Sequence, residues 1–167
     1  MVVGDVNRID LSTSSFERII GDNMLYVDKT RMIEHFLNNA SRVNLIARQR
    51  RMGKSLNMDT IRCFLTDKED LRHLFKGLYI EKSPLWKKAN SAPVFSFDFR
   101  RLTPNLYQKK LFNIIHGYIL EYCNLDELSP ESKSYIESRE YSDPDGLLVL
   151  TESVYKATGK RSYILID

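Results

Sequence analysis

Gly53, Lys54 and Ser55 are the residues best suited to chemistry, because they match the second half of a phosphate-binding P-loop. In such a loop, backbone N–H groups surround the phosphates, the lysine ammonium reaches the β- and γ-phosphates, and the serine hydroxyl binds Mg²⁺. The full pattern has another glycine five residues before Gly53, where this chain has Arg48. The motif is therefore incomplete and depends on the elements around it.

The flanking sequence predicts the elements that a P-loop requires. Residues 43–47 form a short apolar run, which is typical of a buried strand, and residues 56–65 carry apolar side chains at helical spacing. A helix that begins at Lys54 and Ser55 points its positive N-terminus at a phosphate. The alternative is an ordinary turn in which Ser55 caps the helix.

Asp167 provides a second signal at the other end of the chain. It follows the apolar run 163–166, which is typical of a Walker B strand buried on both faces of a parallel sheet. Open α/β sheets bind ligands at the carboxyl ends of their strands, where this aspartate would lie. The two signals together favour a nucleotide site.

Basic side chains gather near the P-loop pattern. Arg48, Arg50 and Arg51 precede Lys54, whereas the whole chain of 167 residues has a net charge of only +3. This clustering suits a nucleotide better than duplex DNA. A solvated loop and contact with nucleic acid both stay open as alternatives, since arginine binds any phosphate well.

The composition predicts a folded, intracellular protein. The chain is 43% hydrophobic, and it has neither a signal-peptide pattern nor an apolar run long enough to span a membrane. Its two cysteines lie in apolar helical patterns, as free thiols usually do. Its three histidines have no partner at metal-ligand spacing. We therefore expect a cytoplasmic protein whose only metal is Mg²⁺ carried with a nucleotide.

Strand and helix patterns alternate along the rest of the chain. We expect a parallel sheet and a P-loop NTPase-like α/β fold with three αβα layers, incomplete at the C-terminus. Residues 1–40 would be a helical lead-in, and residues 41–167 would be the P-loop core. In the first half of the chain, the patterns predict a helix after the capping sequence 14–17, a helix over 33–40 opened by Asp28 and a helix within 68–82. In the second half, they predict a strand over 93–99, a helix from 105, a polar insertion over 126–146 and a helix over 147–157.

Four segments resemble the AAA-ATPase-like proteins of bacteria and archaea, which often carry a restriction-endonuclease-like nuclease domain downstream. Of these segments, the arginine-rich loop is the one most specific to the family, because the family typically has Arg-Pro-Arg-Arg-Phe-Gly-Lys-Ser at this place. Gln49 and Met52 depart from this pattern, and the missing proline at position 49 loosens the turn. The segments that carry the resemblance are residues 15–17 with 26–30, 46–56, 74–78 and 93–99.

The resemblance implies roles for individual residues. Lys54 would contact the β/γ-phosphates of ATP, and Ser55 and Asp167 would hold Mg²⁺. The backbone from Gln49 to Leu56, which includes Arg50, Arg51, Met52 and Gly53, would line the phosphate site. Asp28 and Lys29 belong to the characteristic Tyr-Val-Asp-Lys-Thr segment and are assigned to the site lining without a specific role.

The resemblance also identifies a departure at the end of the sequence. The family usually continues past Asp167 into Glu-Tyr-Asp, where the glutamate polarises the attacking water, and a later strand lies between the P-loop and Walker B strands. We therefore interpret the chain as a fragment that hydrolyses ATP slowly. The alternative is a complete small protein, whose unpaired apolar strand 163–166 would favour aggregation or association with a second chain.

The resemblance predicts that the parent protein hydrolyses ATP to drive a conformational change, with nucleic-acid processing as its task. One alternative is a nucleotide-sensing module that binds without hydrolysis. Another is a module that binds nucleic acid through the arginine loop.

Overall fold

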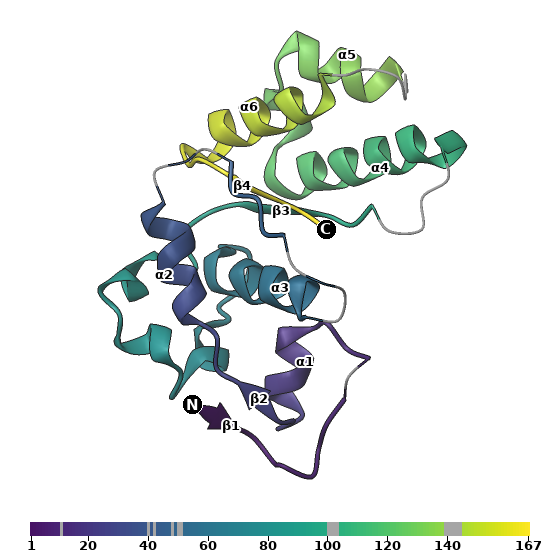
Figure 1. The fold of residues 1–167 in the computed structure, drawn as a ribbon. Coiled ribbons are helices and arrows are strands. Elements are labelled where there is room, and N and C mark those ends of the chain that lie inside the picture. The colour runs from purple at the N-terminus through teal and green to yellow at the C-terminus, as the bar shows by residue number, and fades with distance from the viewer. Residues whose placement is uncertain are drawn as a thin grey trace. The chain divides into compact units, whose positions relative to one another are not determined.

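The chain folds into two compact units, residues 1–91 and 92–167, and each is described here by itself. Figure 1 shows the computed structural model. It describes residues 1–10, 12–39, 41, 43–47, 49, 52–99, 104–138 and 145–167, with the side chains of 104–106 left aside.

The first unit is built from helices and short 3₁₀ turns around an aromatic core. Phe75 is fully buried, and its ring lies 4.9 Å from that of Phe16 and 5.5 Å from that of Phe64. These contacts join three separate segments of the chain. The elements are β1 (Val2–Val3), α1 (Phe16–Gly21), β2 (Tyr26–Val27), α2 (Arg31–Asn38), α3 (Lys54–Leu65) and the 3₁₀ turns η1 (Arg72–Phe75), η2 (Tyr79–Lys82) and η3 (Pro84–Lys88), with β1 and β2 antiparallel.

Helix α1 begins where the capping sequence predicted it. Ser15 is its N-cap, and the Ser15 hydroxyl accepts a hydrogen bond from the Arg18 N–H. A second acceptor comes from α3, where the Asp59 carboxylate accepts the Phe16 N–H at 2.7 Å and also pairs with Arg62 at 2.7 Å. Because the first N–H groups of a helix lack intrahelical acceptors, Asp59 stabilises α1 across the fold.

We expect Asp59→Ala to lower the free energy of unfolding by about 1–3 kcal/mol, since it leaves a partly buried N–H without its acceptor. Asp22→Ala is the matched control, because Asp22 forms an exposed pair with Arg18 at 3.6 Å and such pairs contribute about 0–1 kcal/mol. Denaturant unfolding followed by Trp86 fluorescence measures both. Equal losses in the two variants would contradict the capping role.

The second unit packs helices against a pair of parallel strands. β3 (Val94–Phe97) pairs with β4 (Tyr163–Ile166), so that Phe95 lies opposite Ile164. The core contains Phe95, Phe97, Phe112, Ile115, Ile119, Leu150 and Val154. The helical elements are α4 (Pro104–Tyr122), η4 (Leu125–Glu127), α5 (Pro130–Ser138) and α6 (Gly146–Thr158).

Two serine hydroxyls connect α5 to α6, and a glycine ends α6. The buried Ser132 and Ser153 hydroxyls hydrogen-bond each other at 2.8 Å, which joins α5 to α6. Gly159 ends α6 in the left-handed conformation with φ 70°, a backbone geometry that glycine adopts without steric cost. Helix α6 then gives way to β4 after a short connection.

Much of the predicted element order is confirmed. The structure has a mixed α/β fold with one parallel strand pair. It has helices near where the sequence predicts them, after the capping sequence, before the predicted P-loop, from residue 104 instead of the expected 105, and before Gly159. The polar insertion contains one short helix, α5.

The predicted buried strand at residues 43–47 is wrong. The structure assigns no strand there, and Val43 and Leu45 are 83% and 91% exposed. A strand needs neighbouring N–H and C=O groups, and no strand of the described part of the chain pairs with this segment.

The predicted helix within residues 68–82 is also wrong. Two 3₁₀ turns, η1 and η2, replace it, with Gly77 between them at φ 80°. Three-residue spacing brings Leu71 and Leu74 to one side in a 3₁₀ turn as well as in an α-helix, so the apolar pattern could not separate the two.

None of the described helices is both long enough and apolar enough to cross a membrane.

Candidate functional site

Gly53 sets the start of the helix that carries the predicted P-loop residues Lys54 and Ser55. It lies at φ 73° and ψ 26°, in the left-handed conformation, and its C=O accepts the Asn57 N–H at 2.9 Å as the first bond of α3. A Cβ atom added to Gly53 would have nothing within 4 Å. The position therefore favours glycine because of its backbone conformation and not for lack of space.

We expect Gly53→Ala to destabilise the first unit by about 1–2 kcal/mol, which is the cost of the left-handed conformation for an L-residue. Gly21→Ala is the control, because Gly21 does not have a positive φ and its added Cβ also meets no atom within 4 Å. Denaturant unfolding followed by Trp86 fluorescence reports on this unit. A loss in the Gly21 variant equal to that in the Gly53 variant would contradict this explanation.

Lys54 is folded back over the loop that precedes it. Its Nζ donates to the Gln49 carbonyl oxygen at 3.4 Å. Lys54, Ser55 and Leu56 are half-buried, whereas Gln49 and Met52 are exposed. The first turn of α3 itself contains no acidic residue that would offset the positive end of the helix dipole. The arrangement is suited to receiving an anion.

Three arginines of the predicted phosphate loop, Arg48, Arg50 and Arg51, lie outside the described residues. Their assignment to the site lining stays a prediction.

Asp28 makes contacts that account for its place in the fold. One carboxylate oxygen accepts the Thr30 N–H at 2.9 Å and the Thr30 hydroxyl at 2.7 Å, and the other accepts the Tyr79 N–H at 2.8 Å. The Thr30 hydroxyl in turn accepts the Ile80 N–H at 3.2 Å. Asp28 thus fixes η2 against the start of α2. The neighbouring Lys29 is exposed, and a role in ligand binding stays a prediction for both residues.

Glu34 extends this network, which sequence reasoning missed. Its carboxylate accepts the Tyr79 hydroxyl at 2.8 Å and also accepts the Ser83 hydroxyl. The hydrogen bond from Ser83, followed by the one from Tyr79, lowers the pKa of the Glu34 carboxyl group. The same bond to Glu34 raises the pKa of the Tyr79 hydroxyl. No local pattern could have revealed the network, because the partners lie 45 and 49 residues away in the sequence.

Asp167 lies at the carboxyl end of β4 in the second unit. Its N–H donates to the Phe97 carbonyl at 2.9 Å, and its carbonyl accepts the Phe99 N–H at 3.1 Å. These bonds continue the parallel ladder to the last residue of the chain. The predicted position of this carboxylate at a strand end agrees with the structure.

The two cysteines and the described acidic and histidine residues add little chemistry to the site. Neither Cys63 nor Cys123 forms a disulfide within the described residues, and burial raises the pKa of Cys63 to about 12, which leaves its thiol protonated and unreactive at neutral pH. Within the described ranges, no three His, Cys, Asp or Glu residues are grouped as a metal site.

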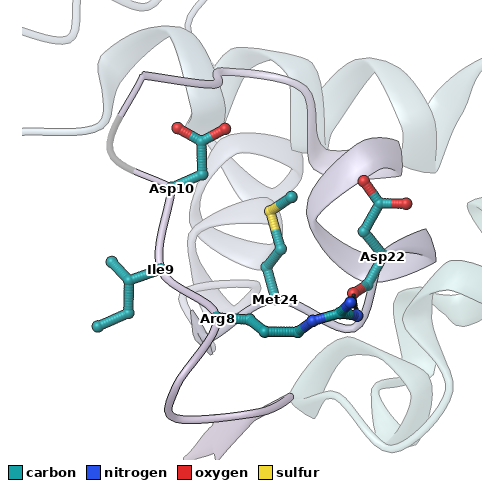
Figure 2. Close-up of a pocket in the computed structure, with 5 residues that line it drawn as sticks. All are labelled: Arg8, Ile9, Asp10, Asp22 and Met24. Carbon is teal, nitrogen blue, oxygen red and sulfur yellow. Dashed lines mark hydrogen bonds between the residues drawn. The ribbon is translucent and has the colours of Figure 1, made fainter.

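A pocket of about 410 Å³ opens near the N-terminus, at a place that the sequence did not indicate. Figure 2 shows the Met24 side chain between Asp10 and Asp22, with Arg8 reaching the Asp22 carbonyl at 2.8 Å. Ile9 completes the lining. Two carboxylates against one guanidinium give no excess of positive charge, so we do not assign this pocket to phosphate.

Comparison with known proteins identifies the family. A family model described as a predicted AAA-ATPase matches residues 10–167. The chain belongs to this AAA-ATPase-like family. No curated protein and no solved structure matches it. Membership supports nucleotide binding by the AAA-ATPase-like chain at a coarse level, and the match includes both the loop before α3 and Asp167.

Proposed function

We propose that this AAA-ATPase-like chain binds Mg-ATP at the loop before α3, and that the parent protein hydrolyses ATP to drive a conformational change. The observation that carries the proposal is the start of α3. There the left-handed Gly53 is followed by Lys54, whose ammonium is folded back toward the Gln49 carbonyl. A lysine in this position can exchange a carbonyl oxygen for a phosphate oxygen with little change in geometry.

The proposed roles follow from the chemistry of each group. The Lys54 ammonium neutralises charge on the β/γ-phosphates, and backbone N–H groups between Gln49 and Leu56 bind phosphate oxygens. The Ser55 hydroxyl and the Asp167 carboxylate are hard oxygen donors, which is the donor type that fits Mg²⁺. The bound ion supplies charge neutralisation during phosphoryl transfer.

Further parts of the proposal rest on no contact within the described residues. The three-layer P-loop fold of the parent protein comes from the element order and the resemblance, and its action on nucleic acid and its link to a nuclease domain come from the resemblance alone. Its cytoplasmic location comes from the composition of the sequence.

Calorimetric titration of Mg-ATP into the chain tests the proposal. Saturable binding is expected, with inorganic phosphate competing weakly and a short single-stranded DNA not competing. Turnover is then measured by phosphate release. Binding without any turnover would favour the nucleotide-sensing alternative, whereas displacement of ATP by the oligonucleotide with steep salt dependence would favour nucleic-acid binding. A folded chain that binds no nucleotide would refute the proposal.

A further inference from the structure

Tyr79 is an aromatic side chain at the surface of the first unit, and its neighbours hold the ring in place. It is the first residue of η2 and is 44% exposed. The guanidinium carbon of Arg31 lies over the ring, 5.8 Å from its centre. The Tyr79 hydroxyl donates to the Glu34 carboxylate at 2.8 Å, and Ser83 donates to the same carboxylate. The two flat groups form a preorganised pair, the Tyr79–Arg31 stack.

The local fold does not require an aromatic ring at position 79. The bond that ties the start of η2 to Asp28 comes from the Tyr79 backbone N–H, and the next bond, to Thr30, comes from the Ile80 backbone N–H. Any residue except proline supplies such donors. The ring is therefore available for a contact outside the chain.

Lysine side chains gather on the turns around this stack. The 3₁₀ turns η1, η2 and η3 each end in or next to a lysine, and η2 contacts both α2 and η3. In Figure 1 these turns belong to the teal segment that lies beside α2. No ion pair joins these lysines to a described carboxylate. Together they form the basic surface, which consists of Lys29, Lys76, Lys82, Lys87 and Lys88.

The carboxylates on these turns are fewer, and each one accepts hydrogen bonds from the chain itself. Asp28 accepts the Tyr79 N–H, Glu34 accepts the Tyr79 hydroxyl, and Glu81 accepts the Gly77 N–H at 2.7 Å. The first unit as a whole has 16 lysines and arginines against 11 acidic residues, whereas the second unit has 9 against 11. The surplus of positive charge favours a polyanionic partner.

A single strand of nucleic acid fits both features of this surface. Its phosphates match the lysines, and its unpaired bases expose flat faces that stack on aromatic rings and on guanidinium planes. A duplex hides these faces inside its own base stack, and a lipid headgroup has no aromatic face to offer. The combination of stack and charge therefore favours a single strand.

We propose that the first unit binds single-stranded nucleic acid at this surface. One base extends the Tyr79–Arg31 stack, and the basic surface contacts the neighbouring phosphates. This site consists of α2, the residues before it and the 3₁₀ turns, and it uses none of the residues proposed to bind Mg-ATP. The proposal therefore goes beyond the proposed function and does not depend on it.

Fluorescence anisotropy of a short labelled single-stranded oligonucleotide tests the stack. Tyr79→Ala is expected to weaken binding about tenfold, since stacking on an aromatic side chain supplies a substantial part of the affinity for each base. Tyr79→Phe keeps the ring and is expected to bind within twofold of the wild type. Unfolding followed by Trp86 fluorescence confirms that both variants are folded before they are compared.

A change in the ligand tests the same contact without changing the chain. A strand of equal length with abasic sites in place of its bases keeps every phosphate. The wild type is expected to bind this strand about tenfold more weakly than the intact one. The Tyr79→Ala variant is expected to bind the abasic strand as the wild type does, because no base is left to stack.

The salt dependence of binding tests the lysines. Lys82→Gln changes an exposed side chain, and it is expected to reduce the slope of log affinity against log salt by about 0.7, the value for one phosphate contact with a single strand. Lys109→Gln is the matched control, because Lys109 is an exposed lysine on α4 of the second unit. Its slope is expected to equal that of the wild type.

Several results would overturn the proposal. They are a folded wild type that does not bind the strand, equal affinity for single strand and duplex, an abasic strand that binds as well as the intact one, or equal slopes for the Lys82 and Lys109 variants. Tighter binding to phosphatidylserine vesicles than to the oligonucleotide would identify a lipid surface instead. All measurements are made without nucleotide, so their failure leaves the proposed Mg-ATP site untouched.

Discussion

Lys54→Ala is expected to weaken the binding of Mg-ATP by on the order of 100-fold, because a hydrogen-bonded charge pair with phosphate contributes about 1.5–3 kcal/mol. In the free chain the Lys54 Nζ donates a long hydrogen bond of 3.4 Å to the Gln49 carbonyl oxygen, and losing this bond costs the folded state little. Calorimetric titration of Mg-ATP into both chains measures the difference in dissociation constant.

Lys76→Ala is the matched control for this variant. Lys76 is an exposed lysine of the same unit, at the end of η1, and its variant removes the same charge without touching the loop. Its dissociation constant should equal that of the wild type within twofold. If both variants lost affinity equally, general electrostatic attraction would explain binding, and the P-loop role of Lys54 would be wrong.

Phe75→Ala is expected to lower the free energy of unfolding of the first unit by about 3–5 kcal/mol. The side chain is fully buried, and its ring contacts those of Phe16, Phe64 and Trp86, with centroid distances of 4.9, 5.5 and 6.5 Å. The variant leaves a cavity where α1, α3 and η1 meet. Denaturant unfolding followed by fluorescence of Trp86, the single tryptophan of the chain, reports directly on this cluster.

Two comparisons make this prediction specific. Phe75→Leu keeps most of the buried volume and should cost less than half as much, whereas Val6→Ala changes a side chain that is 65% exposed and should have an effect within about 0.5 kcal/mol. A small loss in Phe75→Ala, equal to that in the Val6 variant, would show that the cluster does not hold the unit together.

Local signals in the sequence were sufficient for several parts of the structure. The capping sequence before Phe16, the glycine after α6 and the alternating apolar strand before Phe99 act over a few residues, and each element formed near its predicted bounds. Gly53 likewise determines its own backbone conformation. The predicted positions of Lys54 and Ser55 at the start of a helix follow from the same local physics.

Other features depended on partners distant in the sequence. Residues 43–47 have the composition of a strand, yet a strand forms only where another strand supplies hydrogen bonds. The Asp59 bond to Phe16 spans 43 residues, and the Asp28 bond to Tyr79 spans 51. No spacing rule connects such residues, so their roles could not have been predicted.

The sequence by itself determined the α/β character of the chain and its family, and it predicted the P-loop residues, because these depend on residue type and short-range spacing. Only the tertiary structure decided that the Tyr118 hydroxyl binds the outer edge of β3 at Ser96, and that Asp28 and Glu34 hold η2 and η3 in place. The physical reason is that hydrogen-bond satisfaction and burial are properties of contacts between segments, which the order of residues does not specify.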